Sequence, residues 1–432
     1  MQPKRQLSLF DSVCIIVGII VGVGIFETPT TVAGSVEASS TLFIVWLVGG
    51  LLSFTGALCY AELATAHPQQ GGDYVYLTRS YGPWAGFLFG WSQLAIVRPG
   101  DVALMAFIFG RYARTIYGPF EHVEILYAVA AVIVLTGLNI AGVRAGKLTQ
   151  NLLTVVKVIG LLFIIGASLA APPLAAAAET ESTGSGGMKL ALILVMFTFG
   201  GWNEMAYVSA EVKRPERNIA RALILGTISV TALYLLINAA YLHALGIPGM
   251  AKSHAVAVDT LARVLPDAAT RAVTIIICIS ALGAVNGLIF TGARVSYALG
   301  RDHNIFGRVG RWDQDRGTPV WALVIQGVLS LTIILLAGSF IDTILYTTPV
   351  VWTFFLATGL SVFVLRKREG VQSRPFRIPG YPVTPLLFCA CSSFMFYNCV
   401  TYAFSQRPFA LAIAAAVLFA GAILFALTSR AN

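Results

Sequence analysis

The sequence predicts an all-α integral membrane protein, and three observations support this prediction. Only 11% of the 432 residues are charged and 57% are hydrophobic, whereas soluble proteins average about 25% charged residues. The apolar runs are about twenty residues long, as spanning helices require, and are not the roughly ten-residue alternating segments of an outer-membrane barrel. One of these runs, GIIVGVGIFETP at residues 18–29, is interrupted by glycines. We therefore expect a single membrane domain over residues 1–432, organised around that interruption.

Twelve segments of the chain are apolar and long enough to be membrane-spanning helices. They lie at about residues 11–36, 40–66, 83–113, 122–142, 148–171, 188–210, 218–245, 269–300, 319–338, 341–365, 383–404 and 408–428.

Basic residues are distributed unevenly between the two sides of the predicted bundle. The two termini and the loops on their side carry nineteen Lys and Arg residues, and the opposite loops carry seven. Because Lys and Arg concentrate on the cytoplasmic side, we expect a multi-pass protein of the cell (inner) membrane with both termini in the cytoplasm. The net charge of +9 follows from these loops, so we expect a lipid bilayer around the chain and no nucleic-acid partner.

The first span contains Gly22 and Gly24, with Glu27 and Pro29 just beyond them. Each glycine inside a helix costs about 1 kcal/mol relative to alanine. Unpaired backbone inside a membrane is tolerated only where it lines a cavity or a site. We therefore expect the first helix to be unwound in mid-membrane.

A second interruption of similar composition, FTFGGWNE at residues 197–204, falls in the sixth span. Two breaks that are five spans apart are what two inverted repeats of five helices produce. We expect repeats at residues 11–171 and 188–366, followed by two additional helices at 382–428. The alternative explanation is that two glycine-containing helices merely pack closely together.

Several stretches of the chain match one transporter family in order and spacing. GIIVGVGIFETP resembles the first-helix motif of the amino acid–polyamine–organocation (APC) transporters. FTFGGWNEMAYVSAEVKRPERN, at residues 197–218, resembles the sixth helix and following loop of their L-type amino-acid transporter branch. PQQGGDYVYLTRSYGP, VRPGD and SALGAVNGLIFTGARVSYALGRDHNIF agree as well. The resemblance implies a leucine-transporter-type fold, with five-plus-five inverted repeats and two added helices.

The resemblance also implies where an amino acid would bind. A broken helix offers N–H groups and a partial positive charge to a carboxylate, and it offers unpaired carbonyls to an ammonium group. By resemblance, the backbones of Ile20, Val23, Gly24, Phe197, Phe199 and Gly200 bind substrate. Tyr234 would line the cavity or else form an interhelical hydrogen bond, and we add Glu204 to the expected substrate-binding residues. Phe197 resembles the aromatic gate over bound substrate, although it could simply be a packing residue. Relatives often have serine where this chain has Val23, so carboxylate binding here would depend on backbone alone.

Lys157 lies about ten residues into the fifth span, where an ammonium group is costly and usually functional. Its side chain could instead extend to the inner interface. The resemblance implies a different role, in which the lysine takes the place of a sodium ion between the unwound first helix and Ser280. If Lys157 has this role, transport should not require sodium.

Two acidic residues depart from the family pattern. Glu204 stands where relatives commonly carry an aromatic residue, and we expect it to face the pocket. Glu27 lies just past the first break and is either a selectivity residue or an exposed residue of the outer vestibule. If both are ionised near substrate, they favour cationic amino acids or amines; a protonated one could carry a coupled proton.

Arg98 and Asp101 are three residues apart in the third span, which places them on one helix face. We expect them to form a structural ion pair rather than to contact substrate.

The sequence favours a secondary active transporter of amino acids that is sodium-independent and works as an exchanger by alternating access. A proton-coupled permease for cationic amino acids or polyamines is the alternative. No catalytic or metal-ligand pattern appears, so we expect neither an enzyme nor a cofactor nor a metal. Animal members of the branch pair with a glycoprotein through a cysteine between spans three and four. That loop has no cysteine here, so we expect no disulfide-linked heavy chain.

Overall fold

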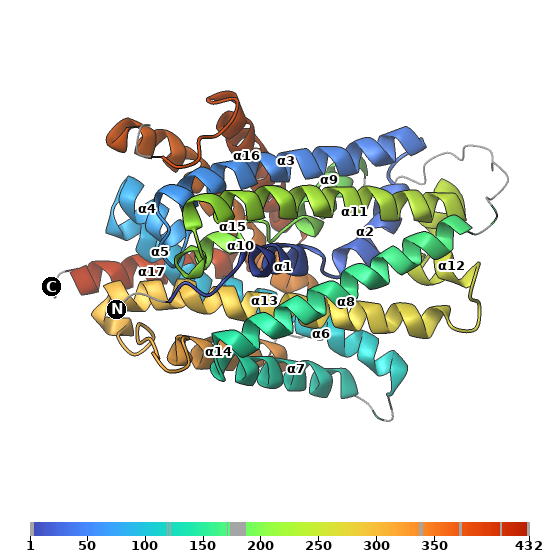
Figure 1. Cartoon of the computed structure of the whole chain (residues 1–432), viewed down its shortest axis with the longest axis horizontal. Helices are drawn as coiled ribbons and strands as arrows, with labels where there is room; N and C mark the ends of the chain where they lie inside the picture. Colours follow the sequence, from blue (N-terminus) through green and yellow to red (C-terminus); the bar gives the residue numbers. More distant parts are fainter. Residues whose placement is uncertain are drawn as a thin grey trace.

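The computed structural model describes residues 4–118, 120, 122–170, 172, 187–336, 340–370, 374–406 and 408–429 as a helical bundle (Figure 1). The helices of the first half are α1 (Leu9–Ile20), α2 (Gly24–Ala33), α3 (Ser39–Ala66), α4 (Asp73–Tyr81), α5 (Pro83–Ser92), α6 (Arg98–Ile116), α7 (Val123–Ile140) and α8 (Val143–Ala170). Those of the second half are α9 (Gly187–Thr198), α10 (Glu204–Tyr207), α11 (Pro215–Lys252), α12 (Val256–Ala262), α13 (Ala269–Asp302), α14 (Val320–Leu336), α15 (Phe340–Glu369), α16 (Val383–Gln406) and α17 (Pro408–Ser429).

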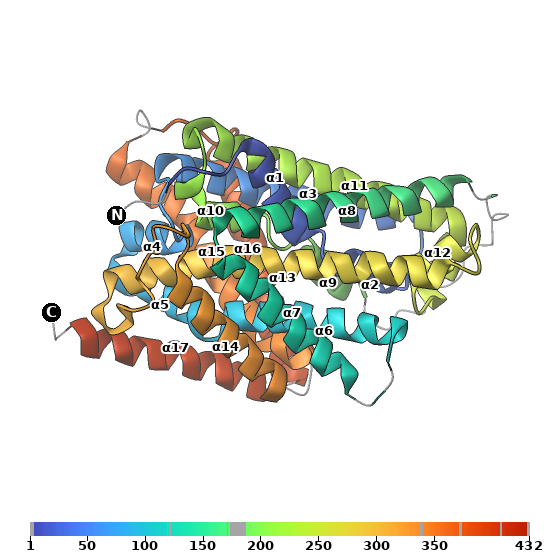
Figure 2. The same cartoon turned by 60° about the horizontal axis from the view of Figure 1, so that its bottom comes forward.

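The short helices pack against long ones: α1 against α8, α11 and α13, α2 against α11, and α10 against α13 (Figures 1 and 2). Among the long helices, α3 packs along α11, and α13 packs along α6 and α8. Both ends of the chain lie at the same end of the bundle in both views. Within the described residues, extended pairing is limited to two isolated bridges, Leu7 with Val212 and Asp313 with Thr318.

Nine helices of the described chain are long and apolar enough to cross a membrane, or ten if the bent pair α1 and α2 is one span. This arrangement confirms an all-helical, multi-pass membrane protein. Fewer than the twelve expected spans are found, because two of the helices in question are short: α14 has 17 residues and α9 has 12. The count of twelve and the division into two repeats therefore remain predictions.

Apolar side chains on the outer helices face away from the protein. Leu152 and Ile159 on α8 and Phe419 on α17 are each 60% or more exposed. In the most apolar window of α17, only 11% of the residues are buried inside the protein. Exposed apolar surface on this scale is what a lipid-facing helix presents.

The end of the bundle near the N-terminus is held by buried charges. The Glu211 carboxylate pairs with Arg294, at 2.8 Å from Nε, and also accepts a hydrogen bond from Gln70 at 2.9 Å. Both partners of the ion pair are almost completely buried. Glu62 on α3 similarly pairs with Arg366 and Arg374. These contacts join α3, α13 and α15 to the loops at this end.

We predict that Glu211→Gln destabilises the protein by about 3 kcal/mol, because it leaves the Arg294 guanidinium buried without a countercharge. Thermal unfolding of the purified protein in detergent measures the change. The exposed Glu216→Gln on α11 is the matched control and should leave the midpoint unchanged. An equal midpoint for both variants would contradict the structural role of the pair.

Candidate functional site

The first break separates α1 from α2. Helix α1 ends at Ile20, α2 begins at Gly24, and the two axes differ by 46°. Val21 leaves the helical region with φ −73° and ψ 70°. A break of this kind frees carbonyl groups at the end of the first segment and N–H groups at the start of the second.

Lys157 satisfies the freed carbonyls from the side of α8. Its Nζ donates hydrogen bonds to the carbonyl oxygens of Gly18 at 2.8 Å, Val21 at 2.9 Å and Ser280 at 2.9 Å. These use all three of its donors. The side chain is completely buried and does not extend to an interface. Gly283 provides the room, since a Cβ there would lie 2.7 Å from Nζ.

Ser280 on α13 completes this contact. Its hydroxyl lies 2.8 Å from the Val21 carbonyl oxygen and 3.1 Å from that of Gly22. The structure therefore brings together Lys157, Ser280 and the broken segment, which come from three separate parts of the sequence.

The second break runs from the end of α9 at Thr198 to the start of α10 at Glu204. Gly201 within it has a φ of +108°, a conformation that side chains disfavour. A Cβ on Gly201 would lie 2.6 Å from Ile19, and one on Gly24 would lie 2.8 Å from the Thr198 hydroxyl. Both glycines are needed for the two breaks to touch.

Tyr234 on α11 joins the two breaks. Its hydroxyl lies 2.8 Å from the Ile20 carbonyl oxygen and 3.1 Å from that of Thr198. The hydroxyls of Thr28 and Thr198 are also hydrogen-bonded to each other, at 2.8 Å. The ends of α1 and α9 are therefore held in a fixed relation.

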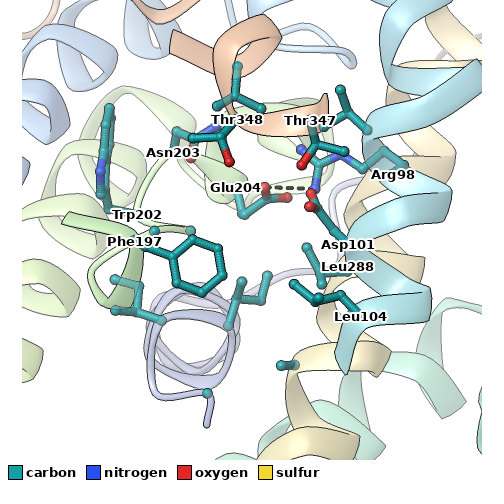
Figure 3. Close-up of a pocket in the computed structure, with 18 of the residues that line it drawn as sticks. Arg98, Asp101, Leu104, Phe197, Trp202, Asn203, Glu204, Leu288, Thr347 and Thr348 are labelled. Carbon is teal, nitrogen blue, oxygen red and sulfur yellow. Dashed lines mark ion pairs between the residues drawn. The ribbon is translucent and has the colours of Figure 1, made fainter. Parts of the chain in front are cut away.

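A cavity of about 160 Å³ lies beside the two breaks (Figure 3). Six of the eight predicted substrate-binding residues line it: Ile20, Val23, Gly24, Phe197, Gly200 and Glu204. Phe199 and Tyr234 lie behind this wall, where their rings pack against each other and against Trp46. Lys157 and Ser280 are not among the lining residues.

The charged groups of the cavity come from α6 and α10. Arg98 Nη1 lies 2.7 Å from the Glu204 carboxylate, and Arg98 Nε donates to Gln93 at 2.8 Å. Glu204 also accepts from the Thr291 hydroxyl at 2.5 Å. The predicted Arg98–Asp101 ion pair is wrong, because Gln93, Glu204 and the ring of Tyr207 at 4.9 Å hold the guanidinium toward α10.

A second cavity, of about 300 Å³, shares Val23, Gly24 and Phe197 with the first. Glu27 lines this second cavity and is about half exposed. Its carboxylate accepts hydrogen bonds from Arg111 and Tyr112, both at 2.6 Å. Phe197 therefore lies where the two cavities meet. We call the first the inner cavity and the second, which extends along α2, the outer cavity. Glu27 lies in the outer cavity, where it is paired with Arg111.

The sequence analysis did not anticipate the contact of Arg98 with Glu204 or of Thr291 with Glu204. The partners are separated by 106 and 87 residues, so helical spacing gives no signal for either contact. Only the position of an arginine inside an apolar span indicates that it needs a partner.

The helical bundle with two touching breaks beside a cavity defines a membrane transport protein. The chain belongs to the amino acid permease family, whose sequence model matches residues 7–426, and within the APC superfamily it belongs to the L-type branch, as predicted. Members of this family are transporters and not enzymes.

Three relatives illustrate the similarity. The human b(0,+)-type amino acid transporter 1 is 31% identical over 402 residues, which cover 91% of this chain and 82% of the relative. The serine/threonine exchanger SteT of Bacillus subtilis is 29% identical over 397 residues, covering 91% and 90%. Rabbit large neutral amino acids transporter small subunit 2 is 31% identical over 402 residues, covering 90% and 75%.

We predict that Gly201→Ala lowers amino acid uptake by at least about tenfold, because the backbone strain and the clash with Ile19 separate the breaks. Gly137→Ala is the control, since nothing lies within 4 Å of a Cβ there. Uptake into proteoliposomes, normalised to folded protein by size-exclusion chromatography, measures the effect. Equal uptake by the two variants would show that close contact of the breaks is not needed.

Proposed function

We propose that this permease exchanges amino acids across the cell membrane, without sodium, by alternating access around the two breaks. The observation that carries the proposal is the Lys157 ammonium bound to three backbone carbonyls beside the first break. A sodium ion at this position would be bound by the same kind of oxygen ligands. Because the protein supplies its own positive charge here, no sodium needs to bind for the broken segment to be held.

The two breaks offer complementary groups to a zwitterion. The N-terminus of α2 faces the cavity at Val23 and Gly24, and its N–H groups and helix dipole suit the α-carboxylate. In the second break the Phe197 carbonyl accepts from the Gly200 N–H and the Thr198 carbonyl from Tyr234. Among the described residues this leaves the carbonyls of Phe199 and Gly200 to suit the α-ammonium. Phe199 and Tyr234 do not line the cavity and would contribute by holding the two breaks in place. Glu204 lines the cavity and could contact substrate directly.

Phe197 would act as the gate. Its side chain lines both cavities, so a change of its position would open or close the path between them. Rocking of the broken helices against the rest of the bundle would then expose the inner cavity to alternate sides. We propose twelve spans in two inverted repeats for this movement, with both termini in the cytoplasm.

The names of two relatives fit this proposal. One is an exchanger for serine and threonine, and another is the small subunit of a transporter for large neutral amino acids. We propose that the present chain works without a disulfide-linked heavy chain, because it has no cysteine between α6 and α7.

We predict that amino acid uptake into proteoliposomes rises several-fold when the vesicles contain amino acid, and that replacing sodium by choline leaves the rate unchanged. The first result follows from obligatory exchange and the second from the fixed positive charge of Lys157. A range of external pH from 6 to 8 provides a further comparison, since proton symport would accelerate at low pH in empty vesicles. A requirement for sodium would contradict the proposal, as would full uptake into empty vesicles.

A further inference from the structure

The Asp101 carboxylate lies in the inner cavity. Asp101 is on α6 and partly buried, and it lines the cavity together with Arg98 and Glu204 (Figure 3). Within the described part of the chain, no hydrogen bond or ion pair is made to its side chain. An unpaired carboxylate in such a site is costly unless something supplies a positive charge or a proton.

The other acidic groups near the path already have partners. Glu204 is paired with Arg98 and hydrogen-bonded by Thr291, and Glu27 is paired with Arg111 in the outer cavity. Arg98 lines the inner cavity together with Asp101, but one guanidinium charge cannot neutralise two carboxylates. Among the residues that line the inner cavity, one Arg against one Asp and one Glu leaves a net charge of −1.

This excess charge lies where a substrate side chain would extend. Phe197 and the breaks form one side of the cavity, and Asp101 projects from α6 on the opposite side (Figure 3). The α-ammonium and α-carboxylate of an amino acid cancel each other and would be bound by backbone groups of the breaks. A neutral substrate would therefore leave the charge of Asp101 uncompensated, whereas a substrate with a cationic side chain would neutralise it.

We propose that the preferred substrates are α-amino acids with a positively charged side chain, and that Asp101 is the residue that selects them by pairing with that charge. The inference rests on the proposed function, since it assumes that the inner cavity is the transport site. It assigns selectivity to Asp101 and not to Glu204 or Glu27, whose charges are already paired.

The test compares lysine with norleucine, which has the same straight carbon chain but no side-chain ammonium group, as inhibitors of labelled amino acid uptake into proteoliposomes. The wild-type protein should favour lysine, and Asp101→Asn should reduce the lysine-to-norleucine preference by at least about tenfold. Asp101→Glu should keep the preference, because it keeps the charge. The exposed Asp267→Asn, beyond the cavity, is the matched control and should behave as wild type.

Each outcome has a distinct meaning. If the wild-type protein transports no amino acid, the proposed function itself fails. If it transports amino acids without favouring lysine, or if Asp101→Asn keeps the preference, only the present inference is overturned. Norleucine uptake that rises at low pH in the wild-type protein but not in Asp101→Asn, with the preference unchanged, would overturn it in favour of proton carriage by Asp101.

If Asp101→Asn abolishes uptake altogether, binding is measured by thermal stabilisation of the purified variants. The inference then requires that lysine stabilises the wild-type protein more than norleucine does and that the difference disappears in Asp101→Asn. Equal loss of stabilisation by both ligands would overturn it.

Discussion

The structure depends on the hydrogen bonds that the Lys157 ammonium makes inside the bundle. A buried charge without partners is costly in any protein interior, yet Lys157 has three carbonyl oxygens within 2.9 Å. Two of these carbonyls, from Gly18 and Val21, lie at the end of α1. The charge and the broken helix therefore stabilise each other: the break supplies acceptors that a continuous helix would have used internally, and the lysine removes the cost of leaving them unpaired.

The fixed first break in turn positions the second. Ile19, in the last turn of α1, lies so close to Gly201 that only glycine fits there, and the Tyr234 hydroxyl reaches a carbonyl of each break. The inner cavity opens beside this contact, with backbone groups on one side and the side chains of α6 on the other. In the function we propose, this arrangement separates recognition of the common part of an amino acid from recognition of its side chain.

Much of this architecture could be predicted from the sequence, because its signals are local. The membrane class follows from composition, the breaks from glycines in apolar runs, and the importance of Lys157 from a charge within a span. The pairing of Arg98 could not be predicted, since helical spacing offers Asp101 as a partner while the fold provides Glu204 from 106 residues away. The lack of a partner for Asp101 among the described residues and the contact of Gly201 with Ile19 are likewise properties of the packing between distant helices.

The central claim is that Lys157 holds the broken segment of α1, and hydrogen–deuterium exchange measures this directly. Wild-type and Lys157→Met proteins would be compared in detergent, with peptides covering residues 14–26 as the readout and peptides of α16 as the internal reference. Exchange should accelerate in Lys157→Met over residues 14–26 and be unchanged in α16. Equal exchange of residues 14–26 in the two proteins, with both folded, would show that the broken segment is held without the lysine and would contradict the account.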